Sequence, residues 1–302
     1  MSFTDDENWI ILSNKIESSI KSKIKNIGTK LKDWDIRINY GIKTGYNEAF
    51  IIDEIIKNDL ISSDPKSAEI IRPILRGRNI KRYAYDFQNE WLICIPCGFS
   101  NSFSTKTRDK EQWFKEEYTS IYNYLVEKEE KLSRKRNPKS KGLYKRDDQG
   151  DYWWELRSCN YMDDFYKPKI LYSEIVQEPR FYYDEQCVFY PEASSFFIIG
   201  EQLKPLVVLL NSDITFQIFK RYYAGGGLGS SGVRYKKAFL LNMPVPKLDN
   251  KSEKILTKIY DQMSSKNFVN CSIEENEAKE FIAYLYNFTK EEVDFLLDNQ
   301  YS

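Results

Sequence analysis

The chain has 302 residues, 41% of them hydrophobic and 30% charged, and its 45 basic and 45 acidic side chains leave no net charge. This length suits one large domain or two small ones and is ample for burying a core. The sequence has no histidine, which excludes Ser-His-Asp and Cys-His hydrolases, HExxH metalloproteases and HNH-type nucleases.

The sequence shows no sign of a membrane segment or of secretion. No apolar run approaches the roughly 20 residues of a membrane helix, and the acidic N-terminus lacks a signal-peptide pattern. The five cysteines are odd in number and scattered, which predicts reduced thiols and a cytoplasmic location. The pair Cys94 and Cys97 forms a single CxxC, and without a second pair or a histidine it argues against a zinc site.

The first hundred residues alternate between short helical and extended patterns. Isoleucines at helical spacing predict an amphipathic helix over residues 10–27 that ends near Gly28. The elements predicted next are a strand from Trp34 to Ile38, a turn from Gly41 to Gly45, a strand from Ala49 to Ile52, a helix from Asp64 to Gly77 with Ile70, Ile71 and Ile74 on one face, and a strand from Trp91 to Ile95.

The remainder of the chain mixes helices and strands and ends in helices. A long helix is predicted over residues 109–132, followed by a loop. Further predicted elements are strands Lys169–Tyr172, Cys187–Tyr190 and Phe196–Ile199, a helix Leu203–Tyr223, a glycine loop Ala224–Gly232, and three terminal helices, the last two capped by Ser272 with Glu275 and by Thr289 with Glu292. The predicted fold class is α+β, a mixed α/β domain over residues 31–250 between a helix in residues 1–30 and a helical segment in residues 251–302.

Basic residues gather in two runs despite the zero net charge. Residues 131–146 contain eight basic side chains and no acidic one, and residues 72–82 contain five and no acidic one. Such a run is either a solvated loop or a site that an anion neutralises. The run 131–146 leads into Tyr152-Trp-Trp-Glu-Leu-Arg157, so aromatic rings and a guanidinium follow it.

The segment Gly227-Leu-Gly-Ser-Ser-Gly232 fits the pattern GxGxxG, but its context does not fit dinucleotide binding. A helical segment precedes it, whereas the nucleotide-binding motif follows a buried strand. Two interpretations stay open: a tightly turned loop, or a loop whose bare backbone lies against phosphates. Arg221, Arg234, Lys236 and Lys237 flank it.

Catalytic motifs for DNA chemistry are missing from the sequence. An adenine methyltransferase needs Asn/Asp-Pro-Pro-Tyr/Phe, and the Asn/Asp-Pro steps present continue as Asp64-Pro-Lys and Asn137-Pro-Lys. Glu129-Glu-Lys131 is an ExK without a clear partner aspartate on a preceding strand. The sequence therefore predicts no catalytic centre, and a self-contained nuclease is the least favoured reading.

Several segments, in order along nearly the whole chain, resemble the TaqI-like specificity domain, the C-terminal part of type IIG restriction-modification enzymes and related adenine methyltransferases. The segments that carry the resemblance are Gly28–Ile52, Asp64–Tyr83, Trp153–Arg157 with Phe165–Tyr172, Leu209–Gly227 with Met243–Pro246, and Tyr284–Val293. The closing part is also similar to type I specificity subunits, although the internal repeat of a complete subunit of that type is absent.

The resemblance implies a target-recognition module that grips duplex DNA, reads bases from the major groove and presents the site to a methyltransferase core. In that family the catalytic domain, with S-adenosylmethionine and Asn-Pro-Pro-Tyr, precedes the segment seen here. We expect no cofactor in this chain, and S-adenosylmethionine in a partner or a linked N-terminal domain. The chain is then a fragment, a truncated product or a separate specificity subunit.

The predicted DNA-binding residues fall into two groups. The predicted phosphate-binding residues are Arg76, Arg78, Lys81, Arg82, Arg134, Lys135, Arg136, Arg221, Arg234, Lys236 and Lys237. The predicted base-reading residues are Lys145, Arg146, Arg157 and Asn160. The partners expected are double-stranded DNA and a methyltransferase or restriction subunit. The alternative is a docking subunit that binds DNA only beside a methyltransferase, which the zero net charge favours over strong solitary binding.

Overall fold

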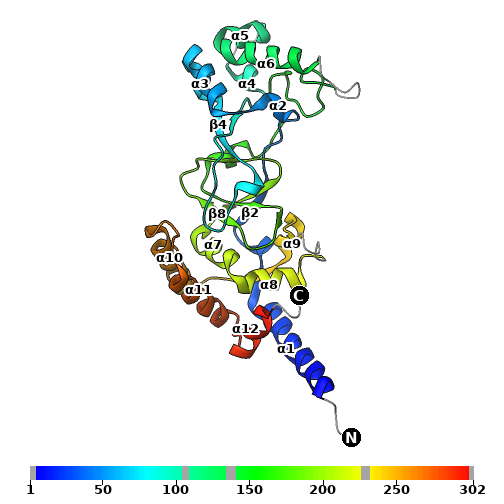
Figure 1. Cartoon of the computed structure of the whole chain (residues 1–302), viewed down its shortest axis with the longest axis vertical. Coiled ribbons are helices and arrows are strands. Elements are labelled where there is room, and N and C mark those ends of the chain that lie inside the picture. The colour runs from blue at the N-terminus through cyan, green and yellow to red at the C-terminus, as the bar shows by residue number, and fades with distance from the viewer. Residues whose placement is uncertain (1–4, 104–108, 134–140, 226–231, 299–302) are drawn as a thin grey trace.

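The computed structural model describes residues 5–103, 109–133, 141–225 and 232–298, with side chains described from Lys15 onward. Figure 1 shows an elongated molecule, with helices α3 to α6 at one end, β-sheets in the middle, and α1 with α7 to α12 at the other end. The fold is α+β with helices flanking small sheets, which confirms the predicted class. No helix of the described residues is both long enough and apolar enough to cross a membrane.

The longest helices are α1, α6, α10 and α11, with 23, 15, 16 and 14 residues. The α-helices are α1 Asp5–Ile27, α2 Asn47–Phe50, α3 Glu54–Ser63, α4 Phe99–Phe103, α5 Lys110–Glu117, α6 Thr119–Ser133, α7 Leu203–Asn211, α8 Asp213–Tyr222, α9 Lys237–Asn242, α10 Asn250–Ser265, α11 Ser272–Leu285 and α12 Lys290–Leu297. The 3-10 helices are η1 Leu31–Asp33, η2 Pro65–Ile70, η3 Gly77–Asn79 and η4 Met162–Tyr166.

The strands form two four-stranded and two two-stranded sheets. Their bounds are β1 Gly28–Lys30, β2 Ile36–Tyr40, β3 Ile51–Ile52, β4 Ile71–Leu75, β5 Trp91–Ile93, β6 Lys169–Ser173, β7 Ile175–Val176, β8 Phe181–Asp184, β9 Tyr190–Pro191, β10 Ser195–Gly200, β11 Val233–Arg234 and β12 Pro244–Pro246. The larger sheets have the orders β2-β10-β6-β8, antiparallel throughout, and β3-β5-β4-β9, in which β4 and β9 run parallel.

The sheet β2-β10-β6-β8 separates two hydrophobic cores. On β10, Phe196 and Ile198 join the core that contains α7 and α8, whereas Phe197 and Ile199 join the core of the α3–α6 end. Successive side chains of a strand point to opposite faces. Because both faces are covered, β6 and β10 read as continuous apolar runs rather than as an alternation.

One ion pair is enclosed entirely within this sheet. The Lys169 ammonium on β6 lies 3.0 Å from the Asp184 carboxylate on β8, and both side chains are at most 1% exposed. Lys169 also donates to the Phe165 carbonyl, and Asp184 accepts from two backbone amides of the β8–β9 connection. Since a buried charge must be both paired and hydrogen-bonded, this pair fixes where β6, β8 and η4 meet.

The two ends of the chain pack into the same core. Helix α1 contacts α12 and β12, and Ile20 and Ile24 are buried in the core that also contains Leu256 and Ile282. The three predicted segments, 1–30, 31–250 and 251–302, thus share one core, and their status as separate units stays a prediction.

Several predicted elements are confirmed by the structure. The N-terminal helix ends where Gly28 begins β1, and the core-forming strands β6 and β10 match the predicted runs within one residue at each end. The capping box of Thr289 with Glu292 is present. These are the segments in which local pattern and tertiary burial agree.

Two long helices predicted from periodicity are each split in two. Ser212, with extended backbone (ψ 138°), divides α7 from α8, and Tyr118 divides α5 from α6. The predicted helix from Asp64 stops as η2 at Ile70, and the following isoleucines form β4, which pairs with β5 and β9. Apolar spacing alone did not separate a helix from a buried strand.

Three smaller predictions are also wrong. Ala49 lies in α2, so the predicted strand is reduced to β3. Cys187 has a left-handed backbone (φ +59°), and only Tyr190 of its predicted strand enters β9. Ser272 is the first residue of α11, which is preceded by Cys271 and lacks a side-chain cap.

Glu292 provides a pH test of the joint between α1 and α12. It accepts hydrogen bonds from the Ser19 hydroxyl at 2.6 Å, from Lys23 at 2.7 Å and from the Thr289 N–H at 2.7 Å. Burial opposes ionisation, but these hydrogen bonds and the Lys23 charge hold the pKa of Glu292 below its ordinary value of 4.5.

Because the pKa of Glu292 is lower in the folded than in the unfolded chain, its carboxylate stabilises the fold at a pH above the unfolded-state pKa. This contribution is lost as the pH falls through the folded-state pKa. We expect Glu292→Gln to lower the free energy of unfolding by about 1–2 kcal/mol at pH 7 and by progressively less as the pH falls below 4.5. Urea unfolding between pH 7 and pH 3 measures this. Glu291→Gln, at an exposed position of the same helix, is the control, and equal effects of both variants would contradict the expectation.

Candidate nucleic-acid interface

The structure buries one of the predicted base readers. Arg146 is 5% exposed, and its guanidinium donates to the carbonyls of Thr44 at 3.2 Å, Asp148 at 3.2 Å and Leu143 at 2.9 Å, and also to those of Trp153 and Glu155. Burial lowers its pKa to about 10, so it stays charged at neutral pH. Arg146 therefore holds its own loop together, and we remove it from the base-reading group.

Four predicted phosphate contacts have partners within the chain. Arg76 makes a two-point ion pair with Glu90 at 2.7 and 2.8 Å, and the hydrogen bond to Glu90 raises its pKa. Arg82 lies 3.4 Å from both Asp213 and Glu275, and Arg234 lies 3.3 Å from Glu174. Arg221 donates to the carbonyls of Leu296 and Asp298 at the end of α12. These guanidiniums are less available to DNA than the sequence predicted.

The other predicted residues divide into three groups. Arg78, Lys145 and Lys236 are exposed, and Lys81 donates to the Arg78 carbonyl at 3.1 Å. Arg134, Lys135 and Arg136 lie outside the described residues, as do residues 226–231 of the glycine loop. Arg157, Asn160 and Lys237 come together around one cleft.

This cleft lies between the end of β2 and the segment before η4. It has a volume of about 440 Å³ and is lined by Tyr40, Gly41, Ile42, Lys43, Arg157, Ser158, Cys159, Asn160, Tyr161 and Ala193. Among these lining residues two are basic and none is acidic. The cleft therefore offers positive charge and hydrogen-bond donors together, which are the requirements for contacting phosphates and base edges.

The turn after β2 is pressed against the chain that joins β9 to β10. The Gly41 N–H donates to the Ser195 carbonyl at 2.9 Å, and the Ile42 N–H donates to the Pro191 carbonyl at 2.8 Å. A Cβ atom on Gly41 would lie 2.1 Å from the Glu192 carbonyl oxygen. Only glycine permits this approach, so the position of Lys43 in the cleft depends on it.

Buried anchors hold the opposite side of the cleft. The Leu156 N–H donates to the Ile95 carbonyl at 2.7 Å just before Arg157. After Tyr161, the Asp164 carboxylate accepts from Asn39 at 2.9 Å and from Lys167 at 2.8 Å. Burial would raise the pKa of Asp164, but these hydrogen bonds, with the Arg37 charge, hold it below its ordinary value.

An aromatic side chain that the sequence analysis missed lies at the rim. Tyr40 is 52% exposed, its ring centre lies 5.0 Å from that of Phe196, and the Lys237 ammonium lies 5.6 Å from the ring centre. Lys43 was missed as well. In the sequence, the signal that could have identified them is an aromatic residue and a lysine on either side of Gly41, directly after a predicted strand. Only the tertiary structure shows that they line the same cleft as Arg157.

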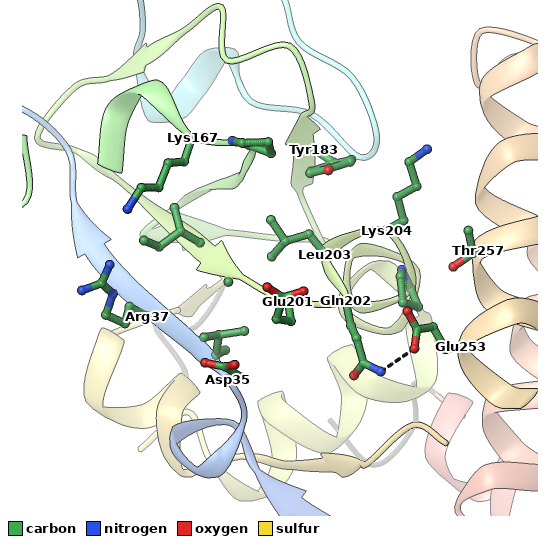
Figure 2. A pocket seen from close by; sticks show the side chains of 15 residues that line it. Asp35, Arg37, Lys167, Tyr183, Glu201, Gln202, Leu203, Lys204, Glu253 and Thr257 are labelled. Atoms are coloured by element: carbon green, nitrogen blue, oxygen red, sulfur yellow. Dashed lines mark hydrogen bonds between the residues drawn. The ribbon is translucent and has the colours of Figure 1, made fainter. Parts of the chain in front are cut away.

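A larger pocket of about 660 Å³ lies at the other end of β2. Figure 2 shows Arg37 and Lys167 on one side of it with Asp35, Glu201 near the middle, and Lys204 with Glu253 on the other side. Arg37 and Lys167 are paired with Asp164, and Lys204 with Glu185 and Asp261. Because this pocket contains carboxylates and its basic residues are ion-paired, it suits the binding of DNA less well than the smaller cleft does.

A possible metal-binding group is already occupied by hydrogen bonds. Ligand atoms of Cys97, Asp151 and Glu155 lie within 4.8 Å of one another. The Glu155 carboxylate, however, accepts from the N–H groups of Gly98, Ser100 and Asp151, so it orders the start of α4 and the loop before Arg157. All five cysteines are free.

The cleft gathers basic and polar side chains on an α+β fold, and the comparisons with known proteins give the class of the protein. Residues 72–245 match the family described as the TaqI-like C-terminal specificity domain. This match covers more than half of the chain, and the chain belongs to that family. It is a DNA target-recognition module of a restriction-modification system.

Individual relatives are consistent with this class. A type II methyltransferase of Methanocaldococcus jannaschii, M.MjaIV, is 23% identical over 260 residues, which are 83% of this chain and 79% of that protein. The structure of the type IIL restriction-modification enzyme MmeI in complex with DNA is similar with a TM-score of 0.61 at 15% identity, over 89% of this chain and 36% of that one. The type IIG restriction endonuclease BpuSI gives a TM-score of 0.51 at 13% identity, over 91% of this chain and 33% of that one. The chain thus spans about a third of each solved enzyme.

The assignment of Arg146 to the scaffold can be tested directly. We expect Arg146→Lys to lower the free energy of unfolding by about 3 kcal/mol, because an ammonium replaces few of the guanidinium's bonds to buried carbonyls. Urea unfolding measures the loss. Arg157→Lys, at an exposed position of the same loop, should change stability by less than about 0.5 kcal/mol. A neutral Arg146→Lys would show that the buried contacts are not needed.

Proposed function

We propose that this chain binds duplex DNA in a sequence-specific manner through the cleft between β2 and η4, and thereby directs a methyltransferase or endonuclease to its target. The observation that carries the proposal is the cleft itself, which in a target-recognition module gathers Lys43, Arg157 and Asn160 on two anchored segments with Lys237 at its rim. Phosphate contacts would position the duplex, and base-edge contacts would give specificity.

The distribution of charge supports the cleft as the place where DNA binds. Residues 269–298, which include α11 and α12, contain eight acidic and two basic residues, whereas no acidic residue lines the cleft. The charges at the cleft and on residues 269–298 therefore differ in sign even though the net charge of the chain is zero. A phosphate backbone would be attracted to the cleft and repelled by the C-terminal helices.

We further propose that catalysis resides outside this chain. The sequence lacks the Asn-Pro-Pro-Tyr-type motif, and the Glu129 carboxylate of the ExK motif is buried and accepts from the Leu143 N–H at 2.8 Å. S-adenosylmethionine would then be bound by a partner or a linked domain. Absence of Mg²⁺-dependent cleavage and of methyl transfer by the isolated chain is the expected result, and either activity would refute this part.

A second candidate function is docking, with DNA bound only in a complex. The observation that favours it is an exposed stripe on α11, where Ile273, Glu277, Glu280 and Tyr284 follow one another at helical spacing, and where Ile273 and Tyr284 are each 75% exposed. These two apolar side chains lie on one exposed helix face, where a partner protein could cover them. Binding of DNA by the chain alone separates the two functions.

Salt dependence tests the grip of the cleft on DNA. We expect the double variant Lys43→Ala/Lys237→Ala to bind every duplex more weakly and to reduce the slope of log K against log salt by about 1.8, since each lost phosphate contact removes about 0.9. Fluorescence anisotropy with a labelled duplex between about 50 and 200 mM salt measures the slope.

The matched control is Lys254→Ala/Lys258→Ala, which removes two exposed lysines from α10. This variant should keep the wild-type slope. If the two double variants behave alike, the cleft is not where the phosphates bind.

A further inference from the structure

We propose, building on the function above, that Arg157 and Asn160 read a guanine and an adenine that lie within about three base pairs of each other, and that Asp148 positions Arg157 for this contact. The geometry of residues 157–160, and of the loop that supports them, determines which bases these side chains can reach.

Residues 157–160 present polar side chains from a rigid base. Arg157, Ser158 and Asn160 are exposed, and no hydrogen bond within the described part of the chain engages the Ser158 hydroxyl or the Asn160 amide. The segment starts directly after Leu156, which is 1% exposed and bound to Ile95, and leads into η4 with its buried Phe165. Free donors on an anchored segment lose little conformational entropy on binding, as specific recognition requires.

The two side chains have the shapes that fit purines. A guanidinium can donate two parallel hydrogen bonds to O6 and N7 of guanine, and a carboxamide can accept from N6 and donate to N7 of adenine. Three residues of extended chain span at most about 10 Å, which is about three steps of a duplex that rises ~3.4 Å per base pair. The two bases therefore lie within one short stretch of the target.

Asp148 orients the guanidinium without being needed for stability. Its carboxylate lies 3.0 Å from Arg157, and the two side chains are 40% and 46% exposed; such exposed pairs contribute little to stability. Its backbone is fixed, because its carbonyl accepts from the buried Arg146 and lies 2.6 Å from the position of a Cβ on Gly45. The buried Arg146 thus fixes the backbone of Asp148, and the Asp148 carboxylate orients the exposed Arg157 side chain.

The experiment is a binding selection from randomised duplex DNA with the full chain, carried out on the wild type and on Arg157→Ala, Arg157→Lys, Asn160→Ala and Asp148→Asn. We expect Arg157→Ala to lose about 5- to 150-fold discrimination at one guanine of the motif, and Asn160→Ala to lose as much at one adenine within about three base pairs of it. Arg157→Lys keeps the charge and should preserve overall affinity while weakening the same guanine.

Asp148→Asn should relax the position read by Arg157 and no other, with an unchanged midpoint of thermal unfolding. The control is Lys204→Ala, which removes a cation that is likewise ion-paired, with Glu185 at 3.1 Å and Asp261 at 3.2 Å, but lines the other pocket. It should leave the motif intact.

The outcomes separate this inference from the proposed function. A wild-type motif that is unchanged in the Arg157 and Asn160 variants, or that changes at bases other than guanine and adenine, overturns the inference while sequence-specific binding stands. If the wild-type chain binds without enriching any motif, the proposed function fails first. If Asp148→Asn leaves the guanine as specific as in the wild type, the positioning role is wrong.

Discussion

The structure depends on a four-stranded sheet whose two central strands, β6 and β10, are covered on both faces. Strands β6 and β10 alternate their side chains between two cores, so that Phe196 and Ile198 pack toward α7 and α8 while Phe197 and Ile199 pack toward the α3–α6 end. A shift of one residue in register would exchange the two sets. The enclosed pair of Lys169 and Asp184 makes such a shift still more costly, because it would leave charges buried without partners.

The recognition cleft follows from this arrangement. Strand β2 is the edge of the same sheet, and it ends at Tyr40 where the chain turns toward the α3–α6 end. The opposite side of the cleft is held by the buried carboxylates of Glu155 and Asp164 and by the buried guanidinium of Arg146. These three hydrogen-bonded side chains therefore support the residues that line the cleft and do not themselves line it. Substitutions of the exposed residues between these anchors are expected to disturb the fold little.

The difference between internally paired and exposed basic residues also explains how a chain with no net charge can belong to a DNA-binding family. Many of its cations are used internally: Arg76, Arg82, Arg221 and Arg234 each have partners within the chain. The cleft is lined by two basic residues and no acidic one, whereas residues 269–298 contain eight acidic and two basic residues. Local potential, rather than the total charge, determines where an anion is attracted.

The sequence by itself determined the fold class, the first helix, the two core strands β6 and β10 and the cap at Thr289, because in these segments local pattern and burial point the same way. It also carried the family resemblance and the grouping of Arg157 with Asn160, since these two residues lie three positions apart. The tertiary structure decided which basic residues are buried and which are exposed. Arg146 and Arg157 look alike in the sequence, yet one donates to five carbonyls in the interior and the other extends into the cleft. Four of these carbonyls lie within nine residues of Arg146, but the guanidinium also contacts Thr44 and the Phe50 ring, about a hundred residues away in the sequence, and no local pattern encodes that packing.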